Sequence, residues 1–239
     1  MFSWPTNYDS CYTLSGVISR EGIGLHSGEK TRVKISSYEK EGYYVSFRDK
    51  PNEIFKLTQD LIGSTMLCTA VKLGGRNLYT IEHLLSSMAG CGLSYIHIEV
   101  DGKEIPLLDG SAIQWVREFE EVGIKKAPKP ENFFREINKP IILNKEDSVI
   151  AATPSGKTTI ISTISFSYKA IGNQTFVIDL NPKSFVEMIA PARTFGFKDQ
   201  FQELSELGLI KGGSLENALV CDGDEWVNPP LRFDNEPIR

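Results

Sequence analysis

The sequence predicts an α+β fold built from two domains. Its 239 residues suffice for two domains of medium size, and the composition, 41% hydrophobic and 24% charged, is that of an ordinary globular protein. Strand-like and helix-like segments occur in both halves without regular alternation, which argues against a doubly wound sheet. Residues 125–130, rich in lysine and proline, separate the halves. We therefore expect a first domain over 1–124, a linker over 125–130 and a second domain over 131–239.

The first half begins with strands and continues into a helix. Residues 12–38 hold two β-rich runs around a glycine-rich turn, and residues 41–49 predict a further strand. Residues 78–92 predict an amphipathic helix with Thr80 as its N-cap and two glycines at its end. The apolar stripe of this helix consists of Ile81, Leu84, Leu85 and Met88.

A strand and a second helix complete the first half. Residues 94–102 alternate between apolar and polar side chains, which predicts a strand with one buried face. The residues expected on that face are Ile96, Ile98 and Val100, with Tyr95, His97 and Glu99 on the other. We expect His97 to be structural or exposed. Residues 111–124 predict an amphipathic helix capped by Ser111 or Asp109.

The second half again mixes strands and helices. The predicted strands cover residues 148–154, 158–168 and 174–180. The predicted helices cover residues 182–190 and 199–209. Residues 214–226 end on a hairpin-like turn. This element content is similar to that of the first half, although no internal repeat is evident.

Charge and cysteine usage exclude several classes of protein. The net charge is −5 and the longest basic run is the lysine pair at 125–126, so electrostatics gives no support for nucleic-acid binding. No apolar stretch approaches the ~18 residues of a membrane span, and the N-terminus lacks the pattern of a secretory signal. The four cysteines include no Cys-x-x-Cys pair, which argues against a structural zinc site and favours reduced thiols in the cytoplasm.

Glu82 and His83 lie side by side at the predicted start of the helix over 78–92. The positive end of the helix dipole disfavours a protonated imidazole, and so favours the neutral form that binds a metal ion. A metal-bound water beside a carboxylate is a common apparatus for hydrolysing an amide, because the carboxylate can take the proton of the water. Taken alone, the pair fits two polar residues on a solvated helix start better than a site, and both interpretations remain open.

Six further segments occur in a distinctive order along the chain. They are "GIGLHSGE" (22–29), "STMLCT" (64–69), "TIEHLLSSMAG" (80–90), "IEVDGKEIPLLDGSA" (98–112), "ARTFGF" (192–197) and "GLIKGGSLENA" (208–218). Together they closely resemble the UDP-3-O-acyl-N-acetylglucosamine deacetylase family, from about residue 11 to the last residue. The resemblance implies a zinc-dependent cytoplasmic hydrolase of lipid A biosynthesis, which releases acetate and UDP-3-O-acyl-glucosamine. It also implies two domains, each a β-sheet packed with helices, whose helical layers face each other across a cleft.

The resemblance implies a role for individual residues in these segments. Glu82 matches the general base of the family, Thr194 matches the hydroxyl that helps to stabilise the oxyanion, and His83 matches a zinc ligand. The residues that match the substrate site or the cleft beside it are Phe195, Met66, Cys68, Leu209, Gly213 and Ser214. His26 matches a histidine in a glycine-rich turn near the metal.

Several of these residues have a second interpretation that needs no site. Thr194 fits an ordinary strand hydroxyl, Phe195 a core aromatic, and Cys68 a small buried residue. Asp109 fits a helix cap or a turn better than a catalytic group. His26 fits a residue that stabilises its turn as well as one that lines the site.

The other two zinc ligands of the family, a histidine and an aspartate four residues later, would follow a stretch like residues 228–239, where this sequence ends. We therefore expect an incomplete second domain and, for these 239 residues alone, weak zinc binding and little or no activity. The implied cofactor is Zn²⁺, with Fe²⁺ as the second possibility because one nitrogen ligand suits both. The implied substrate is a UDP-linked acylated amino sugar, and the complete protein is expected to be monomeric and not membrane-spanning. The alternative is a non-catalytic truncated relative that binds an acylated nucleotide sugar or a protein partner.

Overall fold

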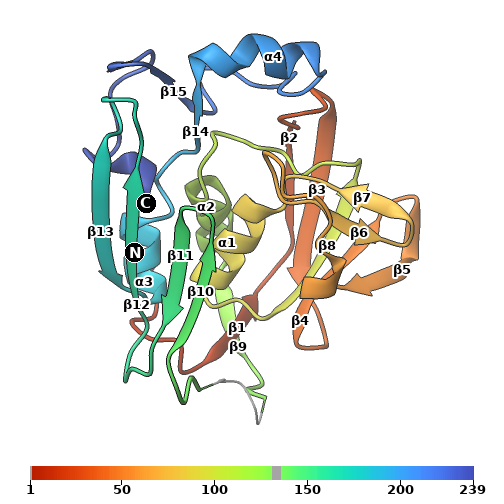
Figure 1. Ribbon diagram of the computed structural model, residues 1–239. Coiled ribbons are helices and arrows are strands. Elements are labelled where there is room, and N and C mark those ends of the chain that lie inside the picture. The colour runs from red at the N-terminus through yellow and green to blue at the C-terminus, as the bar shows by residue number, and fades with distance from the viewer. Residues whose placement is uncertain (1, 131–135) are drawn as a thin grey trace.

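The computed structural model describes residues 2–130 and 136–239 (Figure 1). A five-stranded sheet forms the centre of the first half, in the strand order β2-β3-β8-β4-β5. Its strands are β2 (Ile18–Ile23), β3 (Lys30–Ser37), β4 (Gly42–Phe47), β5 (Lys50–Lys56) and β8 (Tyr95–Asp101). All neighbours are antiparallel except β4 and β8, which run parallel. The predicted strands around the glycine-rich turn, over 41–49 and over 94–102 are thus confirmed.

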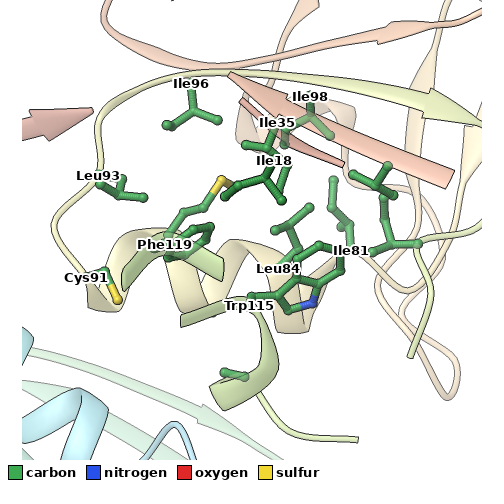
Figure 2. Close-up of a cluster of buried hydrophobic side chains, with 14 of the residues drawn as sticks. Ile18, Ile35, Ile81, Leu84, Cys91, Leu93, Ile96, Ile98, Trp115 and Phe119 are labelled. Atoms are coloured by element: carbon green, nitrogen blue, oxygen red, sulfur yellow. The ribbon is translucent and has the colours of Figure 1, made fainter. Parts of the chain in front are cut away.

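Two helices cover one face of this sheet and enclose the main core. They are α1 (Glu82–Gly90) and α2 (Ile113–Val122). The alternation in β8 buries its predicted face completely, and the apolar stripe of α1 packs onto it. Figure 2 shows this core, in which side chains from both helices meet the sheet at Ile18, Ile35, Ile96 and Ile98. The packing of helices on one face of a mainly antiparallel sheet is an α+β architecture, as predicted.

Shorter elements complete the first half. They are β1 (Cys11–Leu14), η1 (Gln59–Leu61), β6 (Val71–Leu73), β7 (Arg76–Leu78) and β9 (Ile124–Ala127). β1 pairs with β9, so residues 125–127 belong to a strand and the prediction of a structureless linker was wrong there. The error arose because the strand is short, carries two lysines and pairs with a segment more than a hundred residues away. The domain boundaries stay a prediction, and residues 131–135 lie outside the described part of the chain.

The second half contains two antiparallel hairpins followed by a helix. The hairpin strands are β10 (Ile141–Lys145) with β11 (Ser148–Ala152), and β12 (Thr159–Ser165) with β13 (Asn173–Asp179). Helix α3 (Pro182–Met188) starts at a capping box between Asn181 and Ser184. The remaining elements are β14 (Phe195–Phe197), η2 (Lys198–Gln200), α4 (Phe201–Glu206), β15 (Leu219–Asp222), β16 (Glu225–Trp226) and η3 (Glu236–Ile238). Among the described residues, no helix has the length and apolar character needed to cross a membrane.

Both predicted helix caps in the first half were wrong. Thr80 lies outside α1, which begins without any side-chain cap, and its hydroxyl instead donates a hydrogen bond to Glu104. Helix α2 likewise has Ala112 at its N-cap position. Asp109 accepts hydrogen bonds from the backbone N–H and hydroxyl of Ser111, so it fixes the preceding turn, which was the other interpretation of this residue.

Helix α3 packs directly against α1, and a glycine makes this contact possible. A Cβ atom on Gly90 would lie 2.4 Å from Cγ of the buried Phe185 ring. As a result, α1 and α2 lie between the five-stranded sheet and the layer formed by α3, β12 and β13 (Figure 1). This contact therefore joins the helices of the two halves.

Gly90→Ala is expected to lower the free energy of unfolding by about 1–2 kcal/mol. Overpacking costs about 1–3 kcal/mol, and the helix preference of alanine returns only part of this. Urea unfolding would measure the change. Gly156→Ala is the matched control, because nothing lies within 4 Å of the added methyl group. A Gly90→Ala protein as stable as wild type would contradict the close packing of α1 on α3.

Candidate active site

Glu82 and His83 form the first turn of α1, and both side chains are half-buried. Oε2 of Glu82 accepts a hydrogen bond from the backbone N–H of Thr69 at 2.9 Å. Thr69 ends the segment 64–69, so this bond joins two of the segments that the sequence singles out. The carboxylate is thereby held at one oxygen, and its other oxygen can still accept a proton.

The backbone around this turn is strained. Among the described residues, five non-glycine residues adopt a positive φ, and they are Leu67, Thr80, Leu108, Glu146 and Ile210. All of these except Glu146 lie in the segments singled out from the sequence. Thr80, with φ of 57°, is β-branched and lies two residues before Glu82. Such strain persists only where surrounding contacts hold it, and it gathers at functional sites.

His83 is neutral at physiological pH. Burial lowers the pKa of its imidazole below the ordinary value of 6.5, and this effect outweighs the opposing influence of Glu82 and Asp109. Asp109 itself is tied to Arg232 by an ion pair of 2.8 Å between Oδ2 and Nη2. A neutral imidazole has a free lone pair, which can accept a proton or bind a metal ion.

Thr194 lies beside the Asp109–Ser111 turn. Its backbone N–H donates to the carbonyl of Gly110 at 2.7 Å, and its carbonyl accepts the N–H of Leu219 at 2.9 Å. Gly110 has a φ of 76° and no room for a side chain, because a Cβ would lie 2.0 Å from the carbonyl oxygen of Asn217. The turn near His83 is therefore fixed directly against Thr194, the residue that immediately precedes β14.

A pocket of about 420 Å³ opens beside Thr194, within the usual range for ligand pockets. Its apolar lining comes from Leu25, Leu67, Leu107, Phe195, Phe197, Phe201, Leu204, Ile210, Leu215, Ala218 and Val220. The polar groups in the lining are few, and they include His26, Thr194, Gln200 and Ser214. Both ring nitrogens of His26 are buried, and the described part of the chain offers them no hydrogen-bond partner. The pocket is thus suited to an apolar chain with a polar group at one end.

The structure places four of the residues predicted for the site around one pocket. Besides Thr194, the pocket is lined by Phe195, Gly213 and Ser214. Phe195 also packs edge-on against Phe166 and Phe197.

Five predicted positions do not line the pocket, and two of them are Glu82 and His83 at the start of α1. Leu209 and Met66 are not part of its wall, and Met66 is 69% exposed, whereas its neighbour Leu67 does line it. Cys68 is buried close to Thr80 and Glu82. Apart from Phe195, the apolar wall from β14 and α4 was not predicted, although the spacing of Phe195, Phe197 and Phe201 was a usable signal.

The metal site cannot be built from the described residues. Within ranges 2–130 and 136–239, no three His, Cys, Asp or Glu side chains come together as a set of metal ligands. His83 is the one ligand of the resemblance that this chain supplies, so the residues do not fit the three protein ligands of a catalytic zinc ion. The assignment of Zn²⁺, or of Fe²⁺, stays a prediction.

Comparison with known proteins adds independent information. The family model for UDP-3-O-acyl N-acetylglycosamine deacetylase matches residues 12–239. The UDP-3-O-acyl-N-acetylglucosamine deacetylase of Trichormus variabilis is 43% identical over 234 residues, covering 95% of this chain and 84% of the relative. The proteins of the same name from Synechocystis and Campylobacter jejuni are 38% and 33% identical, over 84% and 77% of their own lengths.

Proposed function

This chain belongs to the UDP-3-O-acyl N-acetylglycosamine deacetylase family, and on that premise we propose that it hydrolyses the N-acetyl group of UDP-3-O-acyl-N-acetylglucosamine in lipid A biosynthesis. The products are acetate and UDP-3-O-acyl-glucosamine. The observation that carries the proposal is the apolar pocket beside Thr194, joined through the 109–111 turn to the helix start with Glu82 and His83. This arrangement supports a site in which an acyl chain occupies the pocket and an amide is hydrolysed near the start of α1.

Two residues of the chain act on the amide in this proposal. Glu82 takes a proton from a water molecule as the oxygen of that water bonds to the carbonyl carbon. The π electrons of the carbonyl move onto its oxygen, which becomes the oxyanion. The hydroxyl of Thr194 donates a hydrogen bond to that oxyanion, which lowers the energy of the tetrahedral state. Glu82 then returns the proton to the nitrogen as the C–N bond breaks, so acetate and the free amine leave. His83 is the predicted metal ligand.

The pocket accounts for the acyl group of the substrate. Each methylene buried in an apolar wall contributes about 0.8 kcal/mol, so a chain of several carbons provides much of the binding free energy. Leu204 on α4 contributes to the wall, whereas Leu207, at the end of the same helix, points elsewhere and is 65% exposed. These two leucines form a matched pair for a test.

We expect the full-length protein to release acetate from the acylated substrate and to act at least ~100-fold less efficiently on UDP-N-acetylglucosamine, which lacks the acyl chain. Leu204→Ser should raise KM for the acylated substrate about tenfold with little change in kcat, because it weakens binding of the chain alone. Leu207→Ser should leave both constants unchanged. Equal efficiency on the two substrates would refute the assignment of the pocket. Binding of the acylated substrate without acetate release would favour a non-catalytic relative.

A further inference from the structure

Glu104 is a buried carboxylate that the proposed chemistry does not use. Its side chain is 2% exposed and lies just beyond β8, in the segment 98–112. It accepts three hydrogen bonds, from the backbone N–H groups of His26 and Ser27, both at 2.9 Å, and from the hydroxyl of Thr80 at 2.8 Å. The donors belong to two separate segments that both reach the active site.

The first segment is the glycine-rich turn over 24–28. A Cβ on Gly24 would lie 2.3 Å from Oε2 of Glu104, so only glycine allows the carboxylate to reach the two N–H groups. The carbonyl of Leu25 then accepts the N–H of Gly212 at 2.9 Å, which fixes the loop over 210–214. Leu25, His26 and this loop all contribute to the wall of the pocket. The carboxylate of Glu104 therefore orders a large part of the pocket wall.

The second segment is the entry to α1. Thr80 is held at a φ of 57°, a conformation that a β-branched residue avoids when nothing constrains it. Its hydroxyl bond to Glu104 is a side-chain contact that opposes relaxation, and Glu82 follows two residues later. A change of φ at Thr80 would rotate the first turn of the helix and move the carboxylate of Glu82.

Glu104 is charged in its buried place. Burial on its own raises the pKa of the carboxyl, but the hydrogen bonds from His26, Ser27 and Thr80 outweigh it, so the pKa lies below the ordinary value. An ionised carboxylate only accepts hydrogen bonds, and it can therefore serve donors on both sides at once. A glutamine at this position would instead point its own N–H donors toward one of the two sets of donors.

We propose that Glu104 is a positioning residue, which joins the pocket wall at His26 and Ser27 to the strained Thr80 and thereby sets the place of Glu82 relative to a bound substrate. The inference rests on the proposed function, because it assigns Glu82 the role of the base. It predicts that the loss of either end of the link lowers kcat, since substrate still binds but the base is displaced.

Four variants of the full-length protein test the link. Glu104→Gln and Thr80→Val should each lower kcat roughly 10- to 100-fold, with KM changed much less. Thr80→Ser keeps the hydroxyl that donates to Glu104, so its kcat should stay within about threefold of wild type. Thr13→Val is the matched control, because the buried Thr13 hydroxyl donates to the carbonyl of Tyr95 at 2.6 Å in the β1 region. It should lose comparable stability without loss of kcat.

Hydrogen exchange supplies a test that does not depend on activity. In Glu104→Gln, peptides covering residues 22–29 and 78–86 should exchange about tenfold faster, whereas Thr13→Val should leave both unchanged. Unchanged exchange in both peptides, or kcat equal to wild type in Thr80→Val, would overturn the proposal. If Glu104→Gln does not fold, the Thr80 pair decides alone. If wild type releases no acetate, the proposed function fails, and the exchange experiment still decides whether Glu104 orders both segments.

Discussion

Glu82→Gln is expected to lower kcat for acetate release by about 10²–10⁴-fold, because loss of a general base typically has this effect. Glutamine keeps the length of the side chain, and its carbonyl oxygen can still accept the N–H of Thr69, so the helix start stays in place. What it loses is the ability to take a proton from water. The reaction then has to release that proton to solvent, in a transition state that the site no longer stabilises.

Steady-state kinetics of acetate release, together with a melting temperature, would measure this effect. Glu120→Gln is the matched control, because Glu120 is also half-buried on a helix and accepts a hydrogen bond from Nε1 of Trp4 at 2.7 Å. We expect the control to keep its kcat and both variants to stay folded. A kcat for Glu82→Gln within about threefold of wild type would remove Glu82 from the mechanism.

The periodic parts of the fold could be predicted from the sequence. The alternation in β8 and the stripe of α1 are local patterns, and burial of one face follows directly from them. The caps could not be predicted in the same way. The hydroxyl of Thr80 had a local partner available at the helix start, but it bonds instead to Glu104, 24 residues away in sequence. A long-range contact of this kind leaves no mark on a local pattern.

The candidate site also combines residues that the sequence predicted with long-range contacts that it did not. The pair Glu82–His83 and Thr194 were identified from segments of unusual sequence, and their roles remain proposals. The contacts that hold those segments together involve charges that looked ordinary in the sequence. Arg232, for example, contacts Asp109 and the carbonyl of Pro191, and these contacts exist only after the chain has folded.

The most consequential of these long-range contacts is the buried pair of Glu236 and Arg193. The side chain of Glu236 is fully buried and that of Arg193 is 12% exposed, with Nε and Oε1 2.9 Å apart. Glu236 also accepts the backbone N–H groups of Arg193 and Arg232 at 2.8 and 2.7 Å. Since Thr194 follows Arg193, this carboxylate ties the segment over 232–236 to the residues just before β14, which include the predicted oxyanion donor.

Glu236→Gln is therefore expected to lower the free energy of unfolding by about 3–5 kcal/mol, because it leaves the largely buried charge of Arg193 without an ionised partner. Asp224→Asn is the control. It breaks an ion pair of 2.7 Å with Lys169 in which both side chains are exposed, and we expect no measurable loss. Urea unfolding at pH 7 would compare the two. Equal effects would show that the buried pair contributes no more than the surface pair.

The pH dependence of stability gives the same carboxylate a separate signature. Burial raises the pKa of Glu236, but the hydrogen bonds and charge of Arg193 and the N–H of Arg232 outweigh it, so the pKa lies below the ordinary value of 4.5. Its contribution to the free energy of unfolding is then complete above the unfolded pKa and is lost as the pH falls through the folded value. Wild type should consequently lose stability on acidification more steeply than Glu236→Gln, which has no proton to gain at this position. Parallel acid profiles for the two proteins would mean that the carboxylate is already protonated when the chain is folded, and that the link between Arg193 and the end of the chain does not depend on its charge.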